Sequence, residues 1–127
     1  MIGMSKLTHR IEKKAVEILF DRIMAERNPA DRQKTLKRLS YVMQHLFGDL
    51  FEKESFDDAR RLIDEGGKWF RFLNTALDTL NPHVVKTAVM DLGFEAGFYG
   101  LRTRDAAKAK YHCNIPWAIL FDPTSAC

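Results

Sequence analysis

Cysteine, proline and glycine are all scarce in this sequence. Its 127 residues include two Cys, four Pro and seven Gly. Two cysteines cannot build a disulfide scaffold, and so little proline and glycine excludes a collagen-like or linker-like chain. The longest apolar run, residues 115–121, is far shorter than the roughly 20 residues that cross a bilayer, and residues 1–10 lack the apolar stretch of a secretory signal. We therefore expect a cytoplasmic protein with no membrane partner.

The composition is that of one folded domain. Apolar residues make up 46% and charged residues 29%, and a chain of this length buries enough surface for a core of its own. Residues 1–40 carry ten Lys and Arg against five Asp and Glu, a basic excess that suits nucleic acid. No aromatic or glycine-rich nucleic-acid motif accompanies this charge, so nucleic acid is the partner that we favour least.

Apolar residues recur at spacings of three and four along most of the chain, which predicts five or six helices. Asn28-Pro29 and Asn81-Pro82 each place a capping side chain before a proline, a pattern typical of a helix start. Ser55 is predicted to begin another helix. The expected helix ends and breaks lie at glycines, namely Gly48, the pair Gly66-Gly67, and Gly100.

The same spacings predict which side chains face the core. The expected apolar faces include Leu7, Ile11 and Ile23, then Met43 and Leu46, then Trp69, Phe70 and Phe72, and finally Val85, Val89 and Leu92. Glu95 lies among apolar residues and glycines, and we expect its carboxylate to face solvent. Cys113 is expected to be a buried or half-buried small apolar residue.

The pattern changes after residue 113. Residues 115–121 form a continuous apolar run without helical spacing, bounded by prolines. Such a run is typical of a short strand buried on both faces, as in parallel sheets beneath helices. Because no other segment offers a sheet for this strand to join, we expect the chain to be the front of a longer protein.

The last segment, Asn-Ile-Pro-Trp-Ala-Ile-Leu-Phe-Asp-Pro-Thr-Ser-Ala-Cys at residues 114–127, resembles the entry into a radical S-adenosylmethionine (radical SAM) domain. In that family the first strand of a partial α/β barrel leads into a loop that carries Cys-x-x-x-Cys-x-x-Cys. The resemblance makes Cys127 the first of the three cysteines, with the other two beyond this chain. It divides the chain into a helical domain at residues 1–113 and the first strand and loop of a truncated barrel at residues 114–127.

The resemblance also implies a chemistry for the longer protein. Three thiolates would hold a 4Fe–4S cluster, and S-adenosylmethionine would bind its open iron and be cleaved to a radical that abstracts hydrogen from substrate. Cys127 is then a metal ligand of the parent enzyme. One cysteine cannot hold the cluster, so we expect neither cofactor nor catalysis in the 127-residue chain alone.

Three alternatives remain open from the sequence. The chain is the N-terminal helical part of a radical SAM enzyme, a self-standing helical interaction or regulatory module, or, least favoured, a basic nucleic-acid-binding domain. The first makes the missing barrel its partner in cis. Residues 115–121 either fold back on the helices or pair between copies, and we favour a homo-oligomer through this segment, since an unpaired apolar strand edge is a route to association.

Overall fold

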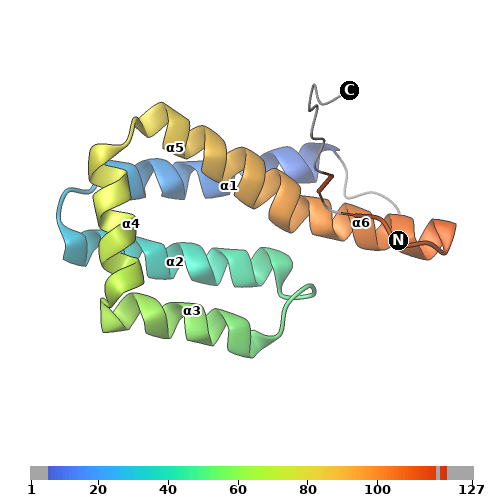
Figure 1. The fold of residues 1–127 in the computed structure, drawn as a ribbon, viewed down its shortest axis with the longest axis horizontal. Helices are drawn as coiled ribbons and strands as arrows, with labels where there is room; N and C mark the ends of the chain where they lie inside the picture. Colours follow the sequence, from blue (N-terminus) through green and yellow to red (C-terminus); the bar gives the residue numbers. More distant parts are fainter. Residues whose placement is uncertain (1–5, 117, 120–127) are drawn as a thin grey trace, which may run out of the picture.

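The structure is a computed structural model that describes residues 6–116, 118 and 119. It is mainly helical, as the sequence predicts. The first four helices are α1 (Lys6–Ala25), α2 (Pro29–Phe47), α3 (Lys53–Glu65) and α4 (Lys68–Thr79). Figure 1 shows α1, α2 and α3 as an antiparallel row, with α4 crossing the row at one end.

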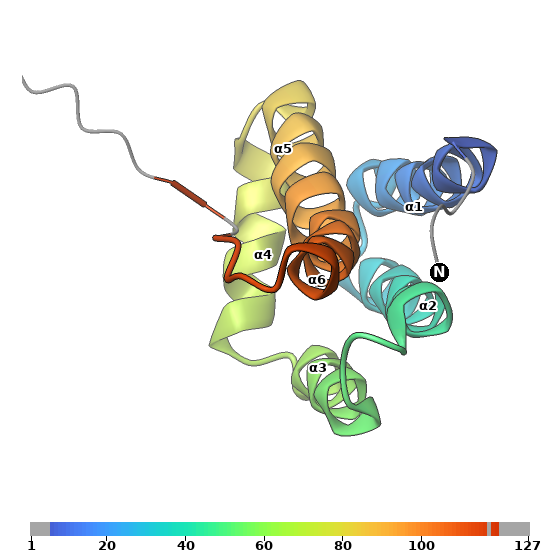
Figure 2. The same ribbon diagram turned by 90° about the vertical axis from the view of Figure 1, so that its right-hand side faces the viewer.

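The last three helical elements follow one another without a break. They are α5 (Pro82–Ala88), a π-helix, η1 (Val89–Tyr99), and α6 (Gly100–Tyr111). Together they form one long rod that runs back beside α1 in the opposite direction (Figures 1 and 2). Five continuous helical segments in the described part of the chain agree with the predicted five or six.

Most helix boundaries lie where the sequence predicts them. The Asn28 side chain accepts a hydrogen bond from the Ala30 N–H at 2.8 Å, and Asn81 caps α5 in the same way. Gly66 adopts the left-handed conformation, with φ of 59°, and separates α3 from α4. The prediction for Ser55 is wrong, because α3 begins at Lys53 without a side-chain cap.

Gly100 does not end its helix. Its φ and ψ of −62° and −34° are helical, and the rod continues through it to Tyr111. The predicted buried face of this rod is also wrong, since Leu92 is 70% exposed while Met90 and Phe94 are buried. The reason is the π-helix: hydrogen bonds from residue i to i+5 widen each turn, so a pattern drawn for 3.6 residues per turn selects the wrong face.

Two apolar clusters form the core. The larger joins α1, α2, α3 and η1 through Val16, Met43, Phe47, Phe56, Met90 and Phe94. The smaller joins α1 and α4 through Phe20, Ile23 and Leu77. Several residues predicted to be buried are exposed instead, namely Leu7, Ile11, Trp69 and Phe72. The apolar face of a helix is therefore wider than the part of that helix which the neighbouring helices cover.

A buried arginine connects three helices at one end of the molecule. Arg32 of α2 is 1% exposed and donates to the backbone carbonyls of Ile23 and Glu26, at 3.3 and 2.7 Å. It also donates to Asn74 and Asp78 of α4, at 2.7 and 2.8 Å. We call these five residues the Arg32 node. Burying a guanidinium requires such full hydrogen bonding, since an unpaired buried charge is strongly unfavourable.

The predicted terminal strand falls partly outside the described residues. Residues 114–116, 118 and 119 are described, and they form no strand. Ile115 and Pro116 lie against α6 beside Gly100, Thr103 and Ala107. Ile119 is 65% exposed. The described part of the apolar run thus touches the helices only at its beginning.

Candidate functional site

The π-helix η1 holds the most unusual polar arrangement in the described part of the chain. Wide helical turns are rare in proteins, but those that occur are frequently found at functional sites. At the end of η1 the Gly100 N–H donates to the Glu95 carbonyl, five residues back, and also to the Gly97 carbonyl, three residues back. A Cβ added at Gly100 would lie 2.9 Å from that oxygen, and one at Gly97 would lie 3.2 Å from the Leu92 oxygen. Glycine at these two positions is therefore what allows the wide turns to close.

Glu95 projects from η1 toward α1, where two cationic or potentially cationic side chains meet it. His9 Nε2 donates to Glu95 Oε2 at 3.0 Å. Lys13 Nζ lies 2.7 Å from Glu95 Oε1. His9 and Lys13 are four residues apart, so they lie on one face of α1 and reach both oxygens of a single carboxylate. We call these three residues the Glu95 clamp.

The clamp is half-buried. The side chains of His9, Glu95 and Lys13 are 21%, 29% and 39% exposed. Burial raises the pKa of Glu95, but the hydrogen bond from Lys13 and the charges of His9 and Lys13 outweigh it, so that pKa lies below its ordinary value. The hydrogen bond to Glu95 likewise holds the pKa of Lys13 above its ordinary value. Glu95 is thus an ionised, paired carboxylate at neutral pH, which makes it a poor general base.

Aromatic rings of η1 pack against the histidine of the clamp. The His9 ring packs on Tyr99, with ring centroids 4.0 Å apart, and on Phe94 at 5.8 Å. Phe94 is 2% exposed and meets the edge of Phe47 of α2. The polar clamp therefore stands directly on the larger core cluster, and a shift of η1 would disturb both.

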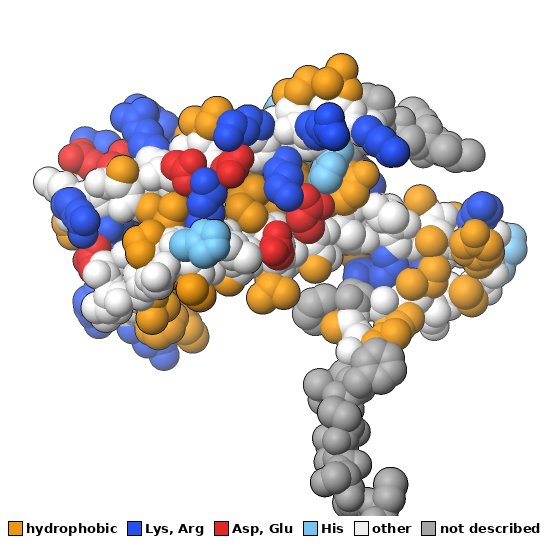
Figure 3. All heavy atoms as spheres, turned by 90° about the horizontal axis from the view of Figure 1, so that it is seen from above, with side chains coloured by type: hydrophobic (Ala, Val, Ile, Leu, Met, Phe, Trp, Pro, Cys, Tyr) orange, Lys and Arg blue, Asp and Glu red, His pale blue; other side chains and the backbone are white. Residues whose placement is uncertain are grey.

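Further along the same interface, Lys86 of α5 continues the ion pairing. Its Nζ lies 3.1 Å from Glu17 and 2.7 Å from Asp21 of α1. Since α1 and the rod are antiparallel, a cationic half of α1 faces Glu95 and an acidic half faces Lys86. Figure 3 shows basic and acidic side chains meeting along this face of the molecule. The complementary charges fix how α1 and the rod lie against each other.

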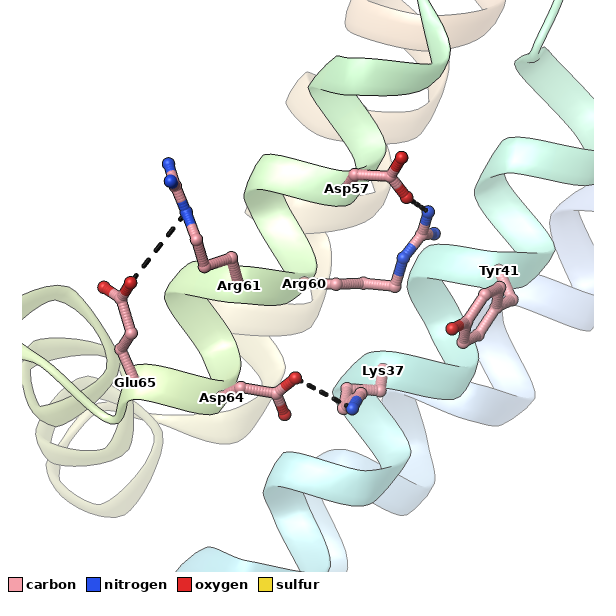
Figure 4. Close-up of a pocket in the computed structure, with 7 residues that line it drawn as sticks. All are labelled: Lys37, Tyr41, Asp57, Arg60, Arg61, Asp64 and Glu65. Atoms are coloured by element: carbon pink, nitrogen blue, oxygen red, sulfur yellow. Dashed lines mark hydrogen bonds and ion pairs between the residues drawn. The ribbon is translucent and has the colours of Figure 1, made fainter.

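Apart from the Glu95 clamp, a polar hollow lies between α2 and α3 (Figure 4). It is lined by Lys37, Tyr41, Asp57, Arg60, Arg61, Asp64 and Glu65. Arg60 is buried and pairs with Asp57, with its guanidinium 4.3 Å from the centre of the Tyr41 ring. Lys37 pairs with Asp64 at 2.9 Å. Because these charges already neutralise one another, the hollow is best explained as packing between two helices.

The two cysteines of the sequence, Cys113 and Cys127, lie near and at the end of the chain. Cys127, predicted as a metal ligand, lies outside the described residues. Cys113 is a free, exposed thiol, so its predicted burial is wrong. It follows His112, whose left-handed conformation with φ of 53° ends α6. This turn directs the chain away from the helix axis and leaves the thiol without a covering side chain.

Glu95 is the residue that the sequence placed incorrectly. Its prediction as a solvent-facing carboxylate is wrong, because its side chain reaches from η1 to His9 and Lys13 of α1 and is half-buried. The available signal was a carboxylate among glycines and large apolar residues, at Gly93, Phe94, Gly97 and Phe98. The partners on α1 were not identifiable, since His9 and Lys13 are more than eighty residues away in the sequence.

Within residues 6–116, 118 and 119, no group of three or more His, Cys, Asp or Glu side chains is arranged to hold a metal ion. None of the helices in this described part combines the length and apolar character that a membrane crossing requires. Searches against protein-family models, curated proteins and solved structures found no match.

Proposed function

We propose that this chain is the N-terminal helical part of a cytoplasmic radical SAM enzyme, with Cys127 as the first ligand of its iron–sulfur cluster. The observation that carries the proposal is the resemblance of residues 114–127 to the first strand and cysteine loop of that family. The described part of the chain offers no set of ligands for a cluster. Cys127 would therefore act with two cysteines that follow it, and the 127-residue chain alone supplies no catalytic step.

The way the chain leaves the helices supports this proposal. The helical unit ends at Tyr111 with a left-handed residue, and Ile119 is largely exposed. Burying one large apolar side chain contributes roughly 1.5–3 kcal/mol, so the exposed Ile119 of the apolar run 115–121 is expected to find cover elsewhere. In the proposed enzyme that cover is a barrel, to which this run contributes the first strand.

The role that we assign to residues 1–113 is structural. They would pack against the barrel and limit access to its mouth, where the ends of the barrel strands converge. This domain has its own core and ion pairs, so it does not need the cluster to fold. A chelator should leave the helical circular dichroism spectrum of the 127-residue chain unchanged.

The test uses the complete gene product. Its sequence beyond Cys127 should contain cysteines four and seven residues further on, and anaerobic reconstitution with iron and sulfide should produce broad visible absorption. Cys127→Ala should abolish the absorption, and Cys113→Ala, the matched control at an exposed thiol, should retain it. Absence of the two downstream cysteines, or loss of the cluster in Cys113→Ala alone, would refute the assignment.

One observation favours the alternative of a helical interaction module. Trp69 and Phe72 lie three residues apart on α4 and are 65% and 68% exposed. Exposed aromatic pairs are frequent at protein–protein interfaces. A complete gene product that lacks the two downstream cysteines would favour this alternative over the enzyme.

A further inference from the structure

The rod formed by residues 82–111 changes its hydrogen-bond register twice without a break. It begins as α-helix at α5, becomes π-helix through η1, and returns to α-helix at α6. In η1 the chain advances more residues per turn than the 3.6 of an α-helix. The angular position of α6 about the rod axis therefore depends on how many residues of η1 keep the wide register.

Three side chains of the rod, spaced four residues apart, pack on one ring of α2. Phe94, Phe98 and Arg102 all contact Phe47, with ring centroids 5.8 and 5.2 Å apart for the two Phe pairs. The Arg102 guanidinium lies 4.9 Å from the centre of the same ring. These contacts join η1 and the start of α6 to α2.

The Glu95 clamp fixes the same register from the side of α1. Glu95 meets His9 and Lys13 only while the turns before it keep their present width, since narrower turns would carry Glu95 around the axis. The groups that face Glu95 are His9 and Lys13 from α1, with Asp91 close enough to Lys13 to act on its charge. The clamp thus joins η1 to α1 through both oxygens of one carboxylate.

The glycines of η1 keep the other register accessible. Gly97 and Gly100 tolerate the close approach of a carbonyl oxygen in the wide turns. Neither glycine obstructs an ordinary α-helix, where alanine is preferred over glycine. Gly93 has no atom within 4 Å of an added Cβ, so its substitution does not discriminate between the two registers by contact.

We propose that η1 is a register switch. The Glu95 clamp holds it in the π-helical register, and release of Glu95 from His9 and Lys13 lets its residues adopt α-helical bonding. Each residue that adopts the narrower turns rotates further about the axis than it did in the wide register, so everything beyond it rotates by the sum of these differences. The switch therefore changes the direction in which α6 and the segment from Asn114 onward leave the helical unit. It uses only residues of this chain and does not depend on the proposed enzymatic function.

The test reads the register directly from NMR couplings through hydrogen bonds in the isotope-labelled 127-residue chain. The wild-type chain should show coupling from the residue 100 N–H to the Glu95 carbonyl carbon. In Glu95→Ala and in Gly100→Ala this coupling should be lost and replaced by one to the Ala96 carbonyl carbon. Gly93→Ala is the matched control and should keep the wild-type coupling.

A distance measurement tests the rotation. Spin labels at Arg38→Cys on α2 and Asp105→Cys on α6, with both native cysteines replaced by Ala, should report a second distance in Glu95→Ala that the wild type lacks. Gly100→Ala acts without removing the clamp, so it keeps the test valid where Glu95→Ala unfolds. An unchanged coupling and a single unchanged distance in both variants would overturn the proposal, as would α-helical coupling in the wild type.

Discussion

The two ends of α1 are held by ionic groups of very different kinds. Near its C-terminus the Arg32 node buries a guanidinium at 1% exposure, with two hydrogen bonds to side chains of α4 and two to the backbone carbonyls of Ile23 and Glu26. Near its N-terminus the Glu95 clamp leaves about a third of its side chains open to water. Water can replace the partners of the clamp but not those of the node. The node therefore determines which helices meet, whereas the clamp determines the rotation of the rod about its own axis.

The largest expected effect comes from breaking the node. Arg32→Met removes four hydrogen bonds and leaves the Asn74 amide oxygen and two backbone carbonyls without their donor. We expect the free energy of unfolding to fall by about 3–5 kcal/mol in urea denaturation. Arg38→Met, at an exposed position of the same helix, should change it by less than about 0.5 kcal/mol. A loss below about 1 kcal/mol for Arg32→Met would mean that the node is not a stabilising element.

Breaking the clamp should cost less. Glu95→Gln keeps the shape of the side chain but removes the charge that His9 and Lys13 share, and the remaining groups can be hydrated. The expected loss in urea denaturation is about 1–2 kcal/mol. The control is Asp58→Asn, which removes an exposed ion pair within α3 and should stay within about 0.5 kcal/mol. Equal losses for the Glu95 and Arg32 variants would erase the difference between the two ends.

Acid should separate the two sites further. The pKa of Glu95 is lowered on folding, so its contribution is complete above the unfolded pKa of about 4.3 and disappears as the pH falls through the lower folded pKa. The stability gap between wild type and Glu95→Gln should therefore close in this range. The gap for Arg32→Met should persist in large part, because the acceptors in Ile23, Glu26 and Asn74 do not titrate. Urea titrations between pH 7 and 3 measure both gaps, and a Glu95 gap that widens as the pH falls would contradict the assigned pKa direction.

The smallest expected effect concerns the caps of the two elements that carry Arg32 and Glu95. Asn28 caps α2, and Asn81 caps α5 at the start of the rod. Both caps are exposed and satisfy backbone N–H groups, so each Asn→Ala substitution should lower the free energy of unfolding by about 1 kcal/mol. Thermal unfolding of the two variants would show whether α2 and the rod differ in helix capping as well as in ionic contacts.

Local signals in the sequence were sufficient for most of the helix boundaries. Each Asn-Pro pair acts through a side chain that caps N–H groups two or three residues ahead, and Gly66 acts through its own left-handed backbone, so these effects do not depend on distant residues. Gly100 shows the limit of this reasoning. A glycine ends a helix when it turns left-handed, but here it accommodates the carbonyl of Glu95 and the helix continues. Which of these occurs depends on packing five residues earlier.

The candidate site could not be predicted because it depends on register and on distant partners. Periodicity placed Leu92 on the buried face, whereas the wide turns of η1 bury Met90 and Phe94. Arg32 was indistinguishable in the sequence from other surface arginines, since its acceptors lie on helices that only the fold brings together. Cys127 lies outside the described residues, so its role stays a prediction. Residues 117, 120 and 121 of the predicted strand lie outside them too, and the four residues of that run that are described form no strand.

The helix α6 has no buried residue of its own. Figure 1 shows it projecting past the row of helices. Near its start Arg102 joins it to α2 by donating to the Leu46 carbonyl at 2.6 Å. Starting a helix is costly, but extending one is not, and α6 extends turns that η1 has already formed. Amide hydrogens in α6 should therefore exchange with solvent in a gradient, slowest near Arg102 and fastest near Tyr111. The helical unit thus opens from this end one residue at a time, while the rest of its core stays closed.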